Sequence, residues 1–335
     1  MSQVQPQEYP VGVTFKQNGI PDSVMALGYE PTDNHSIPSV HDGYVFRREM
    51  LRELLGFLRN PNGDAFFLAG PTGSGKTSGI TEVLGRLNWP CQQITAHGRL
   101  ELNDLIGQFK LVSTAPGQAP EMTFVYGVLP IAMKYGHVLL INELDYADPS
   151  EISGLNDVIE GRPLVITENG GEVVKPHPMF RLIATGNSKG SGDITGMHSG
   201  IQTQNIAFMD RFRLAWLGYI DATEEAEILA SAVPGMPEQI RVKLVEVANS
   251  VRTQFLGESG TGEDGELAVT MSTRTLVRWA TLAFDFRQHP TPLKYALEMS
   301  LTRRASSSDA LAIDKMAQSI LGDQWDNGQS SSQAA

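Results

Sequence analysis

The chain has 335 residues, of which 41% are hydrophobic and 19% charged, a composition typical of a globular protein with enough apolar material for a core. Lys and Arg number 26 against 38 Asp and Glu. The resulting net charge of −12 argues against general adhesion to nucleic acids or anionic membranes, although a local basic groove stays possible. The single cysteine excludes an intramolecular disulfide, and no Cys-x-x-Cys pair or zinc-type Cys/His spacing occurs. No membrane-length apolar run and no secretory signal is visible, so we expect a cytoplasmic protein.

The first half of the chain alternates between strand and helix patterns. Residues 1–40 mix Pro, Gly and short apolar pieces, and we expect a frayed start followed by an arm laid across a domain. Residues 46–59 have the apolar spacing of a helix, and residues 65–69 form a continuous apolar run of strand length. A helix at 78–87 and a short strand at 92–95 are expected next.

The middle of the chain adds two more buried strands and two hairpins. We expect an insert over residues 105–136, in which 108–112 and 122–126 pair as a hairpin. The other expected elements are core strands at 138–141 and 182–185, a helix at 149–159, and a small hairpin of 164–166 with 173–174 around an Asn-Gly-Gly turn. Fully apolar strands separated by helices indicate a parallel sheet that is covered on both faces.

The pattern changes to helices alone after residue 218. The expected helices span 225–233, 237–255, 275–287, 292–303 and 309–321. We therefore predict an α/β core at 41–218, a smaller all-helical domain at 219–322 and, because of its Gln/Ser-rich composition, a disordered tail at 323–335.

A phosphate-binding loop follows the first apolar strand. It reads Gly70-Pro71-Thr72-Gly73-Ser74-Gly75-Lys76-Thr77, which fits the pattern of Gly, four residues and Gly-Lys-Ser/Thr. The glycines let backbone N–H groups surround the phosphates, Lys76 would neutralise the β- and γ-phosphates, and the Thr77 hydroxyl would coordinate Mg²⁺. The helix that starts here adds the positive end of its dipole. The sequence thus predicts an ATP site with Mg²⁺.

Polar residues follow two further core strands. Glu143 ends the strand at 138–141 and would polarise the attacking water, since a phosphate loop supplies no general base. Asn142 stands where such sites usually have an Asp that holds Mg²⁺ through water, and Asp145 is a candidate to compensate for the missing charge. The alternative for Glu143 is an exposed carboxylate at a strand end.

Three other residues are weaker candidates when taken alone. Asn187 follows the strand at 182–185, at the ligand edge of an open sheet, and could orient the water; alternatively it is a turn residue. Arg211 could form only a surface ion pair with Asp210, and Arg274 opens a helical run.

The order of these motifs resembles that of AAA+ ATPases of the MoxR type, especially the branch of the cobaltochelatase small subunit, CobS. The resemblance covers roughly residues 41–321. It rests on the ordered segments 70–77, 105–107, 138–143, 183–187, 210–212 and 272–274, with 44–46 and 86–91 also similar to CobS-like chains.

This resemblance assigns roles that the residues alone do not. It implies that Asn187 is sensor 1, that Arg211 is the arginine finger acting on the neighbouring subunit's nucleotide, and that Arg274 is sensor 2 in a helical lid. Arg213 is a second candidate for the finger. It also implies a hexameric ring with ATP between subunits, a hairpin insert in helix 2 of a P-loop core, and a partner bearing a von Willebrand factor A domain. Asn142 departs from the family pattern, which puts the rate of hydrolysis in question.

We therefore predict an ATPase, a ring-forming motor that remodels or activates a partner protein complex. A cobalt-inserting chelatase subunit is a specific alternative, which ranks second because the seven His are scattered and no cobalt or corrin site is visible. A nucleotide-gated scaffold with little hydrolysis is a further alternative, motivated by Asn142. A nucleic-acid translocase is the last, and the acidic composition argues against it.

Overall fold

The computed structural model describes residues 5–113, 120–190, 192, 200–257 and 265–326. Contacts divide these residues into two units. The first comprises the described residues up to Leu217 except Thr72–Ser74, and the second comprises Gly218 onward together with Thr72–Ser74.

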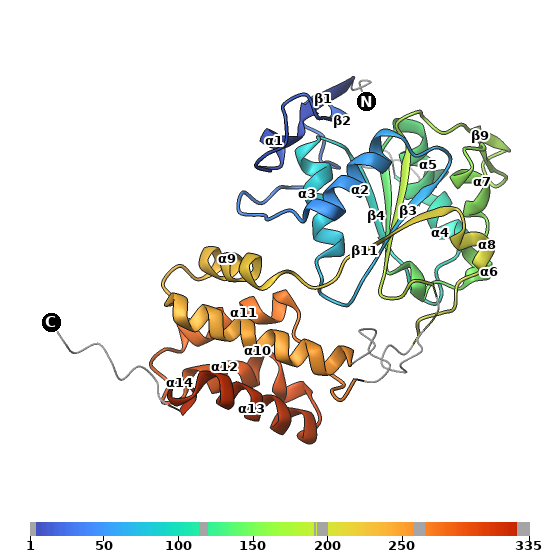
Figure 1. The fold of residues 1–335 in the computed structure, drawn as a ribbon. Coiled ribbons are helices and arrows are strands. Elements are labelled where there is room, and N and C mark those ends of the chain that lie inside the picture. Colours follow the sequence, from blue (N-terminus) through green and yellow to red (C-terminus); the bar gives the residue numbers. More distant parts are fainter. Residues whose placement is uncertain (1–4, 114–119, 191, 193–199, 258–264, 327–335) are drawn as a thin grey trace. The chain divides into compact units, whose positions relative to one another are not determined.

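A five-stranded parallel sheet forms the centre of the first unit (Figure 1), with the order β11-β3-β10-β7-β4. Its strands are β3 (Ala65–Ala69), β4 (Cys91–Thr95), β7 (Val138–Asn142), β10 (Arg181–Gly186) and β11 (Phe212–Trp216). Four of them confirm strands that the sequence predicts. The expected α/β P-loop architecture is thus present.

Successive side chains of the central strands point to opposite faces of the sheet and pack into two separate hydrophobic cores. On one face, Phe66 and Leu140 pack with α2 (Arg48–Arg59) and α3 (Lys76–Arg86). On the other face, Phe67 and Leu139 pack with helices that include α5 (Val128–Tyr135) and α7 (Leu155–Ile159). Because both faces are covered, every residue of β3 is buried, which explains its uninterrupted apolar sequence.

The amino-terminal arm is more ordered than we expected. The strand β1 (Pro6–Pro10) pairs with β2 (Met25–Tyr29), so the frayed start that we expected is wrong for Pro6–Tyr9. The Tyr29 hydroxyl donates to the Gly136 carbonyl at 3.1 Å, and this contact holds the arm against the α/β core. Between the strands lies the single turn α1 (Val11–Thr14).

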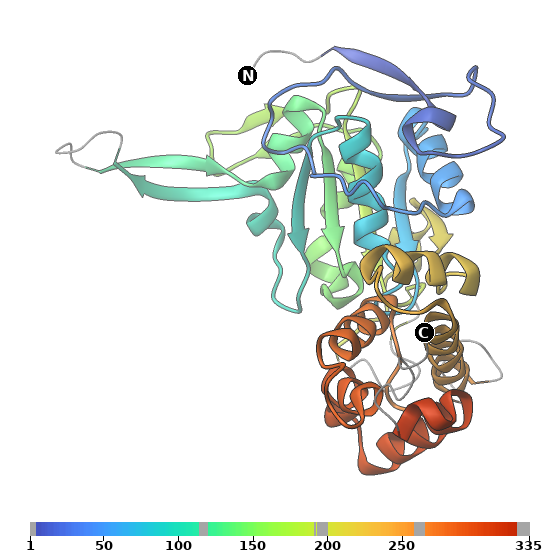
Figure 2. The same cartoon turned by 90° about the vertical axis from the view of Figure 1, so that its left-hand side faces the viewer.

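The predicted insert is present as a long hairpin. Strands β5 (Gly107–Val112) and β6 (Glu121–Tyr126) pair in antiparallel register, and Figure 2 shows them projecting from the rest of this unit. The short helix α4 (Leu102–Ile106) precedes them. The small hairpin is also confirmed, as β8 (Leu164–Ile166) with β9 (Glu172–Val174).

Two features of this unit differ from the sequence prediction. The helix expected at 149–159 is broken at Ser153-Gly154 into α6 (Pro149–Ile152) and α7, because Gly154 favours helix less and leaves room for Leu102, whose Cδ2 lies 2.4 Å from the place of a β-carbon at Gly154. Strand β11 was not predicted. It is an edge strand whose Leu214 and Trp216 are about half exposed, and Arg213 interrupts its apolar residues after Phe212. The turn α8 (Ile206–Met209) precedes β11.

The second unit is helical, as predicted. Its elements are α9 (Ala222–Ala232), α10 (Glu238–Leu256), α11 (Thr273–Asp285), α12 (Pro292–Ser300), a 3₁₀ turn at Thr302–Arg304, α13 (Ser307–Leu321) and α14 (Asp323–Asp326). They enclose a core of their own around Trp279 and Leu244. The expectation that disorder begins at Asp323 is wrong for α14, whose Trp325 is buried in that core; residues 327–335 lie outside the described part.

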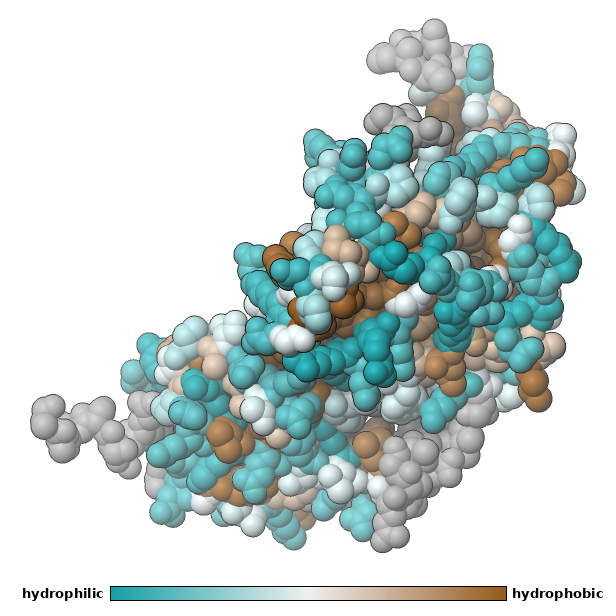
Figure 3. Space-filling model, turned by 45° about the horizontal axis from the view of Figure 1, so that its top comes forward, coloured by the Kyte–Doolittle hydropathy of each residue, from teal (hydrophilic) through white to brown (hydrophobic). Residues whose placement is uncertain are grey.

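The surface contrasts with these cores. On the face drawn in Figure 3, hydrophilic residues predominate and hydrophobic ones occur in small groups among them. In the described part of the chain, no helix combines the length and the apolar composition needed to cross a membrane.

Candidate active site

The candidate residues of the α/β unit gather where three neighbouring strands end. Gly70 follows β3, Asn142 ends β7 and Asn187 follows β10, and these strands are adjacent in the parallel sheet. The carboxyl ends of parallel strands share one edge, which is where open α/β sheets bind ligands. These residues are far apart in the sequence, and the order of the strands in the sheet brings them close together.

The phosphate loop has the backbone that its glycines predict. Gly70, Gly73 and Gly75 have φ angles of +157°, +77° and +90°, values that L side chains rarely adopt. Gly75 also caps α3, so the helix begins at Lys76, at the end of the loop. The tip of the loop, Thr72–Ser74, belongs to the other contact unit.

Lys76 is buried and fully engaged. Its ammonium donates to the carbonyls of Gly70 and Pro71 at 2.7 and 3.2 Å and to Asn187 Oδ1 at 2.9 Å. Burial lowers the pKa of Lys76, and the nearby carboxylates of Glu143 and Asp145 partly oppose that shift. The Lys76 side chain is therefore held beside Gly70 and Pro71 of the phosphate loop, by acceptors that an anionic phosphate can replace.

Thr77 and Asn142 form the second contact of the loop. The Thr77 hydroxyl donates to Asn142 Oδ1 at 2.7 Å. A hydroxyl and an amide oxygen are hard ligands of the kind that Mg²⁺ takes directly or through water, so this donor set fits the ion. Elsewhere among the described residues, no group of three His, Cys, Asp or Glu side chains could hold a metal.

Glu143 is not the exposed strand-end carboxylate of the alternative reading. Its Oε2 accepts from Asn187 Nδ2 at 2.6 Å, and its backbone N–H donates to Thr185 Oγ1 at 3.2 Å. Its φ of +55° is uncommon for a residue other than glycine and turns the chain sharply out of β7. Asn187 thus contacts both Lys76 and Glu143, and one amide joins the phosphate loop to the candidate base.

Asp145 has a different place from the one expected. Its side chain is fully buried, and Oδ2 accepts the backbone N–H groups of Asn187 and Ser188 at 2.6 and 3.0 Å. It therefore anchors the turn that presents Asn187. The spacing to Glu143 drew attention to this carboxylate, but its partners are 42 and 43 residues away.

Sequence reasoning also missed two residues beside the start of α3. Tyr44 shares a side-chain hydrogen bond with Ser78, and burial raises the pKa of the Tyr44 hydroxyl. An Arg47 guanidinium nitrogen lies 3.7 Å from the place that a β-carbon on Gly75 would take. No local motif marks them, because they come from the segment before α2.

The two arginine-finger candidates lie at the end of the sheet where its parallel strands begin, opposite the end that carries the phosphate loop. Arg211 precedes β11, and its carbonyl accepts the N–H of Ala65, the first residue of β3. Its guanidinium pairs with Glu160 at 2.6 Å and not with Asp210. Arg213 pairs instead with Asp64 at 2.7 Å. Five residues of β3 separate this end from Gly70, roughly 17 Å at about 3.3 Å per residue.

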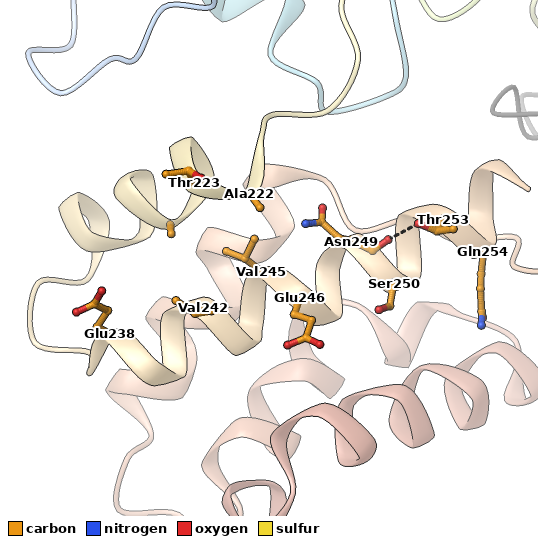
Figure 4. A pocket seen from close by; sticks show the side chains of 11 residues that line it. Ala222, Thr223, Glu238, Val242, Val245, Glu246, Asn249, Ser250, Thr253 and Gln254 are labelled. Carbon is orange, nitrogen blue, oxygen red and sulfur yellow. Dashed lines mark hydrogen bonds between the residues drawn. The ribbon is translucent and has the colours of Figure 1, made fainter.

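Arg274 belongs to the helical unit, where it is exposed in the first turn of α11. The helical unit also contains a groove, whose charge does not suit a nucleotide. The groove of about 810 Å³ between α9 and α10 (Figure 4) is lined by Val242, Val245 and other residues, and its charged lining residues are Glu238 and Glu246. Carboxylates of this kind repel phosphate.

Comparisons with known proteins show the family of this chain. The family model of the dynein-related AAA domain matches residues 65–212, and that of the CbbQ/NirQ/NorQ C-terminal domain matches 225–319. The aerobic cobaltochelatase subunit CobS of Sinorhizobium sp. is 32% identical over 274 residues, which cover 80% of this chain and 79% of CobS. An uncharacterised protein of Staphylococcus epidermidis is 31% identical over 187 residues, 56% of this chain and 67% of that protein. A solved structure of a Thermotoga maritima RuvB variant is 15% identical, with a TM-score of 0.45, over 85% of this chain and 74% of that one.

Proposed function

The chain belongs to the AAA+ ATPases of the MoxR type and is related to CobS, and from this premise we propose that it hydrolyses ATP to remodel a partner protein complex. The observation that carries the proposal is the contact of Asn187 with both Lys76 and Glu143. It joins a phosphate-binding cation, a polar orienter and a carboxylate base at one sheet edge.

The residues at the carboxyl ends of the strands have different proposed roles in ATP hydrolysis. Lys76 would exchange its carbonyl and amide acceptors for the β- and γ-phosphates, and Thr77 and Asn142 are the residues that would hold Mg²⁺. Mg²⁺, when bound, supplies positive charge against the phosphate oxygens. Glu143 accepts a hydrogen bond from the attacking water and takes up its proton, and Asn187 orients that water. The site makes ADP and phosphate at pH 7 without a covalent intermediate.

Assembly is part of the proposed activity. Arg211 lies at the sheet edge opposite Lys76, so it cannot reach the nucleotide bound by its own chain. We assign it to the nucleotide of a neighbouring copy, where a positive charge can raise the rate on the order of 10³-fold. Arg274 is assigned to the γ-phosphate from the helical unit. These roles imply a ring, for which six copies and a von Willebrand factor A partner are the expectation from the family.

The test is steady-state ATP hydrolysis by the wild type, Glu143→Gln and Lys76→Ala, with nucleotide affinity measured in parallel. Glu143→Gln should retain ATP binding and lose hydrolysis by 10²-fold or more, on the order of a lost general base. Lys76→Ala should lose binding. If the wild type and Glu143→Gln turn over ATP equally slowly while both bind it, the chain is not a motor.

That last result would favour the second candidate, a nucleotide-gated scaffold. Asn142 supports it, because a neutral side chain beside Thr77 holds Mg²⁺ less tightly than a carboxylate. A cobalt-inserting subunit is a narrower version of the motor, supported by the likeness to CobS alone. Cobalt-dependent stimulation of ATP hydrolysis in the presence of its partner complex would test that version.

A further inference from the structure

An ion pair that has no role assigned so far lies in the core of the helical unit. Glu225 on α9 and Arg252 on α10 have side chains that are 0% and 3% exposed. Arg252 Nη1 and Nη2 donate to the two carboxylate oxygens of Glu225, each at 2.7 Å. Such a two-pronged pair fixes both partners in direction as well as distance.

The remaining groups of the pair are directed at one segment. Arg252 Nε donates to the Met271 carbonyl at 2.6 Å, and the Thr273 hydroxyl donates to Glu225 Oε1 at 2.7 Å. The guanidinium lies 4.6 Å from the centre of the Tyr219 ring, whose hydroxyl pairs with Thr270 Oγ1 at 2.9 Å. Residues 270–273 are thereby held through a carbonyl and two hydroxyls.

This segment leads directly into Arg274. Ser272 caps α11, with its hydroxyl accepting the N–H of Thr275 at 3.1 Å, so the first turn of the helix starts from a fixed point. Asn249, which is labelled in Figure 4 and lies on α10 one turn before Arg252, accepts a further hydrogen bond from Arg252 Nη1 at 3.0 Å. The pair therefore ties α9 and α10 to the start of α11.

Stability alone does not account for such an arrangement. Two charges taken from water lose their hydration, and apolar side chains of similar volume often stabilise a helical core as well or better. An apolar pair could not bind the Met271 carbonyl or the Thr273 hydroxyl. What the ion pair adds is a fixed backbone immediately before Arg274.

We propose that Glu225 and Arg252 are positioning residues for Arg274: through Met271 and Thr273 they set the direction in which its guanidinium leaves α11. The inference rests on the proposed role of Arg274. It predicts that loosening the pair reduces the discrimination between ATP and ADP, because only ATP carries the phosphate that Arg274 meets.

The experiment measures the dissociation constants of ATP and ADP for the full chain in a Glu143→Gln background, which prevents hydrolysis. Arg274→Ala should lower the preference for ATP roughly tenfold, the value of one charge-assisted hydrogen bond. Arg252→Lys keeps the charge but cannot reach both Glu225 and Met271, and it should lower the preference several-fold, on the order of half that effect on a logarithmic scale. The double variant Arg252→Lys/Arg274→Ala should lower the preference for ATP no further than Arg274→Ala alone.

Two further variants separate positioning from folding. Thr273→Val removes one hydroxyl and leaves the ion pair intact, and it should shift the preference in the same direction by roughly twofold to threefold. Arg241→Lys changes an arginine of α10 that donates to the Met236 carbonyl, and it should leave the preference unchanged. Thermal unfolding of each variant shows whether the helical unit is intact.

The outcomes are distinct. A wild type that binds no ATP refutes the proposed function and the inference with it. If Arg274→Ala leaves the preference for ATP unaltered, Arg274 does not meet the γ-phosphate, and the inference that it is positioned for that role is wrong. If Arg274→Ala behaves as expected but Arg252→Lys and Thr273→Val weaken ATP and ADP equally, or add their full effect to Arg274→Ala, the ion pair is only structural and the inference alone is wrong.

Discussion

Replacing Asp145 by alanine should disable hydrolysis without touching a group that meets the nucleotide. The carboxylate anchors the turn after β10 by accepting two backbone N–H groups, those of Asn187 and Ser188. Without it, both N–H groups lose their acceptor in a partly buried place, and Asn187 is no longer fixed between Lys76 and Glu143.

The magnitude follows from these contacts. Hydrogen bonds to a charged acceptor contribute about 1.5–3 kcal/mol each, so two of them, at 2.6 and 3.0 Å, set a range of about 3–6 kcal/mol. Oδ1 of the same carboxylate has no hydrogen-bond partner among the described residues, so its hydration is not fully replaced, and we expect the loss near about 3 kcal/mol. A displacement of Asn187 by about 1 Å would lower kcat roughly 10²-fold.

The assay pairs urea unfolding with ATP hydrolysis at saturating ATP. Asp145→Asn keeps an oxygen acceptor without the charge and should fall between wild type and Asp145→Ala in both measurements. Asp148→Ala is the matched control: that carboxylate also accepts two hydrogen bonds, from Ser150, but it is exposed and caps α6. Its loss should lower stability slightly and leave kcat unchanged. An Asp145→Ala variant that is folded and hydrolyses ATP at the wild-type rate would refute the anchoring role.

Three further predictions address the metal, pH and assembly. Asn142→Asp should lower the Mg²⁺ concentration for half-maximal hydrolysis roughly tenfold, since a charge is added beside Thr77; an unchanged Mg²⁺ titration would contradict this. Burial, with a smaller contribution from His177, lowers the pKa of His137 to about 4. The unfolded chain then binds more protons than the folded one between about pH 6.5 and 4, so stability should fall by on the order of 3 kcal/mol as pH falls through this window, and His137→Gln should flatten that part of the urea midpoint profile. Arg211→Ala should bind ATP normally and hydrolyse it on the order of 10³-fold more slowly. If Arg213→Ala shows this loss and Arg211→Ala does not, Arg213 is the arginine finger.

Much of the site could be predicted because its chemistry fixes residue types at short spacing. The phosphate loop is legible in eight consecutive residues, and its context of a buried strand and a helix is confirmed by β3 and α3. The strands β7 and β10 are buried on both faces, so their apolar runs mark them and the polar residues that follow. Local sequence was sufficient where local contacts decide the structure.

The features that were missed depend on partners far along the chain. Asp145 meets the turn at Asn187 only because β7 and β10 lie side by side. Strand β11 is half exposed at the sheet edge, and Arg213 interrupts its short run of apolar residues. The arm hairpin contains Pro6 and Pro10, which argue against a strand, yet the pairing of β1 with β2 and the contact of Tyr29 with Gly136 outweigh that local preference.

The distance between the two edges of the sheet has a consequence for control in the cell. A lone copy carries Lys76 near one end of β3 and Arg211 at the other. If Arg211 acts on the nucleotide of a neighbouring copy, as proposed, dilution by itself would switch such an enzyme off. Turnover per molecule would climb steeply with protein concentration and then level off, and an inactive copy mixed into the population would silence its neighbour as well as itself. Abundance would then regulate the activity, with no inhibitor needed.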